Sequence, residues 1–454
     1  MRESNCAHWN PAMSLANYVE CHACSESVRF AASPSCSLRF AMSRTQSSLG
    51  YVLSVEGYLI LVARQASRLR RMNRFQAGAG AVPSQTVNHS GACEETDSNT
   101  DILEVFPMPT PPMHPEPATA EFPLTPAIIF EMLQAHQRTA ALKTAIELDL
   151  FRALGQEPVD ASTIAQACSA SPRGIRILCD FLVINGVLTK EARGYRHTPL
   201  SATFLDPRSP ASVASIARFL TNPAMQDTYK NLTDIVRAGR TTMEGDGSVE
   251  PENPIWVQFA ETMAPMMAPL TAPLGAVVLE GHSGPMRVLD IAAGHGLFGI
   301  EIAKQNPEAR VTGLDWAPVL RVALENARRS GVEDRYNMLP GSAFDVDFGG
   351  PYDAVLLTNF LHHFDQPTCV GLLKKVHAAL RPGGRAATLE FVPNEDRVSP
   401  PMPAAFALTM LTSTAAGDAY PLSELSAMYA EAGFKDVTAH PIPMSPHTIV
   451  MGTA

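Results

Sequence analysis

The fold is decided by one segment, Val288-Leu289-Asp290-Ile291-Ala292-Ala293-Gly294-His295-Gly296-Leu297-Phe298-Gly299. Its first residues are typical of a buried strand, and the glycines then allow a tight turn and a close approach of a ligand to the backbone. The residues after the turn begin a helix, whose N-terminus carries partial positive charge. This order predicts a ligand-binding loop at the edge of a parallel sheet.

The residues on both sides of this loop extend the same pattern. Strands are expected at 287–292, 310–315, 336–339, 353–359 and 385–391, with helical stretches between them. Alternation of this kind predicts an α/β domain, here residues 284–454, whose parallel sheet is covered by helices on both faces. Its ligands should bind at the carboxyl ends of the strands, near the point where the strand order reverses.

The residues before this domain indicate a mostly helical unit at 120–283. Apolar residues recur every three or four positions through 126–150, which predicts a helix with a core or dimer face. Asp160 or Ser162 can cap a helix through Cys168, and Ser171 followed by Pro172 opens another that ends at Gly186. A hairpin at 187–197 completes a winged-helix pattern.

Further helical stretches are expected at 214–239 and 254–279, the second broken or kinked at Pro265 and Pro269. A winged helix raises the possibility of DNA binding. The recognition helix would offer only Arg173 and Arg176, however, so DNA binding is not favoured.

Residues 1–119 lack a regular pattern, and the segment 106–117 is rich in proline. We expect disorder there, or an extension of the gene model that precedes a natural start at Met108 or Met113. The cluster Cys21, His22 and Cys24 has no second ligand pair at zinc spacing, so no metal site is predicted.

The composition limits the class of partner. The chain has 454 residues and a net charge of −10, which argues against a nucleic-acid partner. The longest apolar run, 51–63, is shorter than the ~20 residues of a membrane span, and no secretory pattern is visible. We expect a cytoplasmic protein with free thiols, no membrane partner and a small-molecule ligand.

The glycine loop alone leaves the cofactor open. Gly294, Gly296 and Gly299 also satisfy the dinucleotide pattern, and Asp315 lies 21 positions beyond Gly294, where a ribose-binding acid is expected. Asp290 inside the strand favours a positively charged ligand instead of a pyrophosphate. A nicotinamide-dependent oxidoreductase therefore stays as an alternative.

Later strand ends carry groups that suit a nucleoside. Asp315 offers a carboxylate for ribose hydroxyls, and Trp316 offers a ring for the adenine side. The remaining predicted cofactor residues follow the third strand or end the fourth: Ser342, Ala343, Phe344 and Thr358.

The fourth strand is followed by Asn359-Phe360-Leu361-His362-His363-Phe364. A neutral histidine here can take a proton from a phenol near neutral pH. With this motif in place, residues 122–454 resemble the caffeate and hydroxyindole type of O-methyltransferase, as found among bacterial small-molecule methyltransferases. The resemblance implies a winged-helix dimerisation domain before a class I methyltransferase domain that binds S-adenosylmethionine.

The resemblance also implies roles for particular residues. Residues 288–296 match the family's cofactor glycine loop, Asp315 its ribose acid, and Leu361-His362 the pair that holds the general base. Residues 381–385 match a Pro-Gly-Gly turn, and 435–440 with 448–451 match a closing antiparallel pair. Glu390 matches the acid that flanks the base.

The sequence departs from the family at the catalytic loop. His363 and Phe364 stand where Asp and Trp are frequent, Ser342 replaces an acid, and the second flanking Glu is missing near residues 417–420. We predict a homodimer in which His362 deprotonates the acceptor, Glu390 orients His362, and Phe259, Met263, Phe406 and Met410 hold an aromatic ring. A regulatory winged-helix protein with a ligand-sensing domain is the second alternative.

Overall fold

The computed structural model describes residues 124–454. The predictions of disorder, of a start at Met108 or Met113 and of no metal at Cys21 lie outside the described residues.

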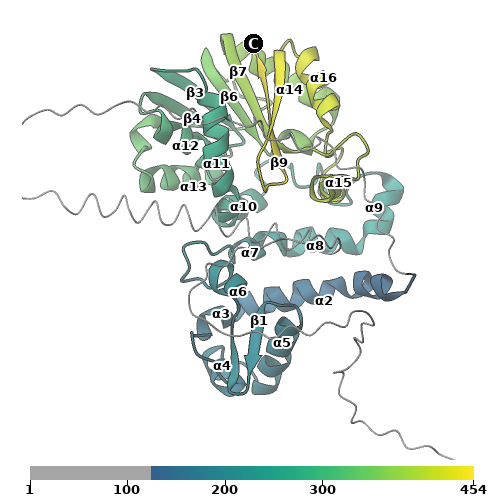
Figure 1. Ribbon diagram of the computed structural model, residues 1–454. Coiled ribbons are helices and arrows are strands. Elements are labelled where there is room, and N and C mark those ends of the chain that lie inside the picture. The colour runs from purple at the N-terminus through teal and green to yellow at the C-terminus, as the bar shows by residue number, and fades with distance from the viewer. Residues whose placement is uncertain (1–123) are drawn as a thin grey trace, which may run out of the picture. The chain divides into compact units, whose positions relative to one another are not determined.

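The N-terminal part of the described chain is the predicted winged helix (Figure 1). Its elements are α2 (Ala127–Glu147), α3 (Leu150–Ala153), α4 (Ala161–Ala167), α5 (Pro172–Ile184), β1 (Leu188–Glu191), β2 (Gly194–His197) and α6 (Pro199–Phe204). Asp160 caps α4 by accepting the N–H groups of Ser162 and Thr163, and Ser171 caps α5, with Pro172 in its first turn. Both caps were predicted, because capping chemistry is local. The helices and the hairpin enclose one apolar core.

The N-terminal two thirds of α2 stay uncovered on all sides in the single chain, because every residue of 127–140 is exposed. Large apolar side chains of its first two turns are exposed, among them Ile129, Phe130, Met132 and Leu133. An apolar face of this size on a described helix suggests an interaction surface.

The middle of the described chain is helical, as expected, but it is divided into more and shorter helices than the sequence predicted. The stretch 214–239 forms α7 (Ile216–Leu220), α8 (Pro223–Lys230) and α9 (Leu232–Ala238), because Asn222 and Pro223 start a new helix. The stretch 254–279 forms α10 (Ile255–Thr262) and α11 (Ala264–Leu279), which meet at a 70° bend just before Pro265. Pro269 lies inside α11 and does not end it, so the helix is not broken there.

Within residues 124–454, no single helix is long and apolar enough to cross a membrane. Only the bent pair α10 and α11 reaches that length and composition when taken together.

The C-terminal part is the predicted sheet. Its strands are β3 (Met286–Ile291), β4 (Ala309–Asp315), β5 (Tyr336–Pro340), β6 (Tyr352–Thr358), β7 (Leu380–Phe391), β8 (Lys435–Pro441) and β9 (His447–Thr453). Their order is β5-β4-β3-β6-β7-β9-β8, in which β5 to β7 run parallel and β9 lies antiparallel to both β7 and β8. The predicted closing pair is confirmed.

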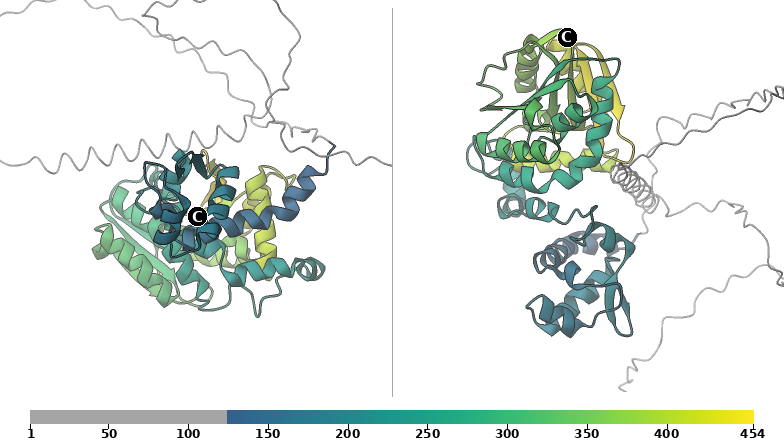
Figure 2. Two further views of the ribbon diagram at one scale, coloured as in Figure 1. Left: turned by 90° about the horizontal axis from the view of Figure 1, so that it is seen from below. Right: turned by 90° about the vertical axis from the view of Figure 1, so that its left-hand side faces the viewer.

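Helices cover both faces of the sheet, as predicted, and Figures 1 and 2 show the layers from three directions. The covering helices are α11, α12 (Leu297–Gln305) and α13 (Ala317–Arg329) in one core, and α14 (Gln366–Ala379) and α16 (Leu422–Glu431) in the other. The remaining helix, α15 (Pro401–Ser413), follows β7 and lies beyond the ends of the strands, next to α8 and α9 (Figure 1). Alternate residues of β6 enter separate cores: Leu356 packs with α11 and α12, while Leu357 packs with α14 and α16. This alternation follows from the two-residue period of a strand. Because α11 already packs on the sheet, it adjoins the domain predicted to begin at 284.

The site is positioned by the strand order. The chain moves from β3 outward to β4 and β5, then returns to the other side of β3 as β6. The carboxyl ends of β3 and β6 therefore lie side by side at the reversal, where a crevice for a ligand forms.

Candidate active site

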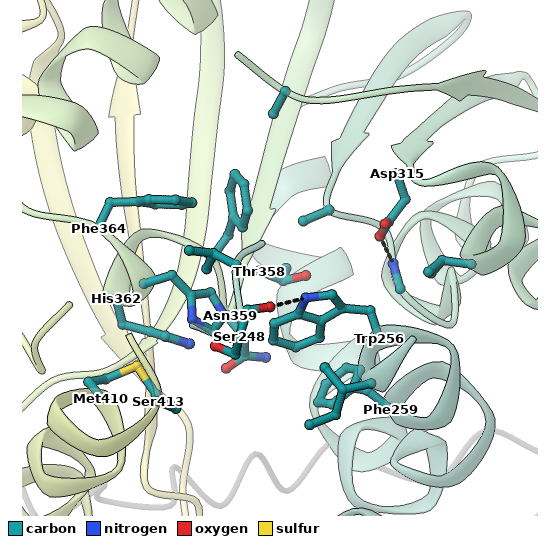
Figure 3. Close-up of a pocket in the computed structure, with 18 of the residues that line it drawn as sticks. Ser248, Trp256, Phe259, Asp315, Thr358, Asn359, His362, Phe364, Met410 and Ser413 are labelled. Carbon is teal, nitrogen blue, oxygen red and sulfur yellow. Dashed lines mark hydrogen bonds between the residues drawn. The ribbon is translucent and has the colours of Figure 1, made fainter. Parts of the chain in front are cut away.

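A cavity of about 1000 Å³ opens at this edge of the sheet. Its wall combines the ends of β3, β4 and β6 with residues from α8, α10 and α15. Figure 3 shows His362, Met410 and Ser413 on one side and Asp315 on the other, with Trp256 and Phe259 below. The volume is large enough for more than one small ligand.

The glycine loop turns as predicted at the end of β3. Ala292, Gly294 and Gly296 all have positive φ, at 53°, 55° and 74°. The Gly294 N–H donates to Oδ2 of Asp315 over 2.9 Å, so the loop and the acid of β4 are tied together. Burial raises the pKa of Asp315 to about 6. Gly294 and Asp315 both lie on the cavity wall.

Two predicted cofactor residues lie behind the loop instead of on the cavity wall. Oδ2 of Asp290 accepts the Gly299 N–H over 3.2 Å, which holds the first turn of α12. Asp290 is fully buried, and burial raises its pKa to about 8. A side chain at Gly296 would collide with Ala323 and the Tyr336 hydroxyl, so glycine is required there by packing as well as by φ.

The cavity wall also contains the predicted adenine residues Trp316, Ser342, Ala343 and Phe344, and the further predicted cofactor residue Thr358. Lys375 fixes this loop, because its ammonium donates to the carbonyls of Ala343 and Phe344, each over 3.0 Å. The edge of Phe344 meets Phe364 with ring centroids 5.0 Å apart. Rings and backbone groups at such a site suit a flat heterocycle.

His362 and Glu390 form a buried pair between the ends of β6 and β7. Nδ1 of His362 lies 2.5 Å from Oε2 of Glu390. Oε1 of Glu390 accepts the N–H groups of Phe360 and Leu361, over 3.1 and 2.9 Å, so the same carboxylate fixes the turn that carries His362. Because a carboxylate accepts at Nδ1, Nε2 of a neutral His362 carries no proton. The pair can therefore accept a proton on the cavity side.

The predicted acceptor residues lie on two sides of His362. Phe406 of α15 meets the His362 ring at 4.9 Å, and Met410 lines the same wall. Met263 and Phe259 also line the cavity, but Phe259 stacks on His295 of the glycine loop, with centroids 6.1 Å apart. Phe259 thus lies next to the cofactor loop as well as the acceptor end.

A segment that the sequence reasoning missed, 241–253, crosses the acceptor end. Ser248 donates its N–H to the Ser413 carbonyl over 2.7 Å, and its own carbonyl accepts the Trp256 indole N–H over 2.8 Å. Trp256 in turn meets His363 at 5.2 Å. We name residues 241–253 the strap. A glycine-rich run before a predicted helix was its only sequence signal, because its partner Ser413 is 165 positions away.

The segment where the second flanking acid is missing packs through its backbone. Asp418 donates its N–H to the His362 carbonyl over 3.0 Å, while its carboxylate pairs with Arg397. A Cβ at Gly417 would collide with that same carbonyl. Glu390 is therefore the carboxylate that contacts the His362 ring in the described chain.

Within residues 124–454, no group of three or more His, Cys, Asp or Glu side chains is arranged to hold a metal ion. The described cysteines Cys168, Cys179 and Cys369 are buried free thiols.

Two family models match the chain. The model of the O-methyltransferase dimerisation domain matches residues 130–207, and that of the O-methyltransferase domain matches residues 270–435. Acetylserotonin O-methyltransferase of Mus musculus is 29% identical over 67% of this chain and 83% of its own length.

Solved structures give the same result. A putative O-methyltransferase from Nostoc punctiforme is 46% identical, with a TM-score of 0.71 over 73% of this chain and 99% of its own. Human N-acetylserotonin methyltransferase, solved in complex with S-adenosylmethionine, has a TM-score of 0.64 over 74% of this chain and 99% of its own. At 22% identity the second likeness concerns the fold.

Proposed function

This chain belongs to the O-methyltransferase family and is an S-adenosylmethionine-dependent enzyme acting on small molecules. From this premise we propose that it methylates a hydroxyl of a small aromatic acceptor, with His362 as the general base. Membership of this family excludes the nicotinamide alternative, because its members use S-adenosylmethionine.

The residues of the cavity fit this cofactor. Asp315 offers its carboxylate to ribose hydroxyls, Trp316, Ala343 and Phe344 offer rings and backbone groups to adenine, and Gly294 leaves room along the loop. Asp290 and Gly296 shape the loop from behind, and Thr358 closes the floor at the end of β6. When bound, S-adenosylmethionine supplies an activated methyl group on a sulfonium.

His362 would move one proton. Nε2 takes the proton of the acceptor hydroxyl as the oxygen attacks, and Glu390 holds the imidazolium through Nδ1. Phe406, Met410 and Met263 keep water away and align the acceptor ring, and alignment carries much of the rate of an in-line displacement. Phe259 would contact both acceptor and cofactor, because it spans from the acceptor wall to His295.

The observation that carries the proposal is the buried His362–Glu390 pair on the wall of an apolar cavity beside Asp315. The test is His362→Ala, with His440→Ala on β8 as the matched control. We expect turnover of a phenol to fall about 10²-fold or more in His362→Ala alone, with nearly unchanged calorimetric affinity for S-adenosylhomocysteine. Equal turnover would remove the base assignment.

We also propose a homodimer formed through residues 120–283, with the exposed apolar face of α2 in the contact. A double variant in which charged residues replace both Met132 and Leu133 should not form the dimer, because the contact would bury the new charges. Light scattering after size exclusion, with the exposed position Arg173→Glu as control, measures the mass. An unchanged dimer in the double variant would place the interface elsewhere. Domain limits at 120, 284 and 454 and a cytoplasmic location stay predictions.

A further inference from the structure

The cavity is large and mostly apolar, and its described lining includes aspartates but neither lysine nor arginine. We propose that the acceptor is an uncharged, flat aromatic phenol, and that carboxylated or sulfonated phenols of the same shape are excluded by the cavity wall. This inference rests on the proposed function, because it names the acceptor class for the same site.

The wall holds no cationic partner for an anion. Of the described residues that line the cavity, none is a lysine or an arginine, whereas four are acidic: Asp246, Asp315, Asp345 and Asp365. Asp246 belongs to the strap and stands exposed at the acceptor end. The nearby Lys375 is already bound to two carbonyls. An anionic substituent would therefore lose its water and gain no compensating charge from the cavity wall.

The histidines of the wall do not replace the missing cations. Burial, together with the neighbouring His362, holds the pKa of His363 well below its usual value, and burial lowers the pKa of His295 to about 4. Both are neutral at physiological pH. A proton gained by His362 forms an ion pair with Glu390 at 2.5 Å and leaves that pair with no net charge.

The shape of the acceptor end suits a ring system. Phe406, Met410 and Trp256 line it, and methionine adapts to an irregular flat surface. Phe406 stacks at 4.0 Å on Phe391 and meets the His362 ring edge, so it is held in place from behind. An apolar slot of this kind discriminates against a charged substituent, because burying a charge without a partner is costly.

Two fluorescent probes with one skeleton test the charge selection directly. N-Phenyl-1-naphthylamine is uncharged, and 8-anilinonaphthalene-1-sulfonate adds a single sulfonate to the same rings. Both are titrated into the full chain saturated with S-adenosylhomocysteine. We expect the neutral probe to bind at least about 30-fold more tightly. Ala405→Trp, which fills the acceptor end, should weaken the neutral probe and so locate it in the cavity.

A charge variant supplies the second readout. Met402 lines the cavity mouth and is 63% exposed, so Met402→Lys adds an ammonium without disturbing a core. We expect Met402→Lys to reduce the ratio of neutral-probe to anionic-probe affinity about tenfold. Two controls should leave this ratio unchanged: Met402→Gln, and Met444→Lys, which adds the same charge at an exposed site off the cavity wall.

Four outcomes of the probe titrations count against the proposed charge selection. Equal affinities in the unmodified chain, a tighter anionic probe, no binding of either, or a neutral probe that Ala405→Trp leaves untouched would each overturn the inference. A chain that selects the neutral probe but methylates no phenol would keep the charge selection and refute the proposed reaction.

Discussion

Replacing Glu390 by Gln should separate the chemistry of the site from its shape. The carboxylate makes four contacts: with the N–H groups of Phe360 and Leu361 and the hydroxyl of Thr388 through Oε1, and with Nδ1 of His362 through Oε2. Glutamine keeps one oxygen for the two backbone groups. Its amide nitrogen, which donates, then faces Nδ1.

His362 must respond by changing its tautomer. Nδ1 becomes the acceptor, so the proton moves to Nε2, and the nitrogen on the cavity side can no longer take a proton from the acceptor. Loss of a general base costs about 10²- to 10⁴-fold in turnover, which corresponds to about 2.7 to 5.4 kcal/mol at 1.36 kcal/mol per tenfold. Exchanging a charged hydrogen bond for a neutral one should lower the free energy of unfolding by about 1 to 2 kcal/mol.

The assay follows release of S-adenosylhomocysteine at saturating donor, with calorimetric binding of the same product and a thermal melt. Glu424→Gln is the matched control, because Glu424 pairs with Arg397 away from His362. His362→Ala combined with Glu390→Gln should be no slower than His362→Ala alone, since the two residues act as one unit. Turnover of Glu390→Gln within threefold of the unmodified enzyme, or additive losses in the double variant, would refute the reasoning.

Three further predictions follow from single contacts. In the proposed binding mode, Asp315 would bind ribose hydroxyls as a carboxylate. Burial raises its pKa to about 6, so affinity for S-adenosylhomocysteine should fall as the pH drops through 6. Calorimetry on Asp315→Asn should show binding weakened about 10-fold or more at pH 8 and no such pH dependence. Burial raises the folded-state pKa of Asp290 to about 8 from its ordinary value of 3.8. The folded state therefore binds more protons between these values, and stability should decline as the pH rises from about 4 to 8. Asp290→Asn should flatten this slope in chemical denaturation, and an identical slope would contradict the assignment. Gly247 and Gly239 both have positive φ, but a Cβ at Gly247 would lie 2.4 Å from the Ser413 carbonyl oxygen, whereas a Cβ at Gly239 meets nothing within 4 Å. Gly247→Ala should therefore lower the melting temperature and raise the acceptor KM more than Gly239→Ala does. Equal effects of the two variants would mean that the strap is not held at this contact.

Local patterns were sufficient for much of the fold. The caps Asp160 and Ser171, the hairpin and the alternation of strands and helices are short-range features, so the sequence predicted them. The glycine loop with Asp315 and the pair His362 and Glu390 follow from the rule that parallel strands present their carboxyl ends at one edge. These residues share the site because the strands share the sheet.

Other features depend on segments that are distant in the chain. The sequence placed Asp290 with the cofactor, whereas the tertiary structure buries its carboxylate under α12, because the Gly299 N–H needs an acceptor there. It also left the strap unassigned, although Ser248 and Trp256 complete the acceptor end through contacts with Ser413 and His363. Periodicity reports which side of an element is buried, but not which distant side chain covers it. The sequence by itself therefore determined the elements and the sheet edge at which the site forms, and only the packing of α10, α15 and the strap decided the shape of the cavity proposed to hold the acceptor.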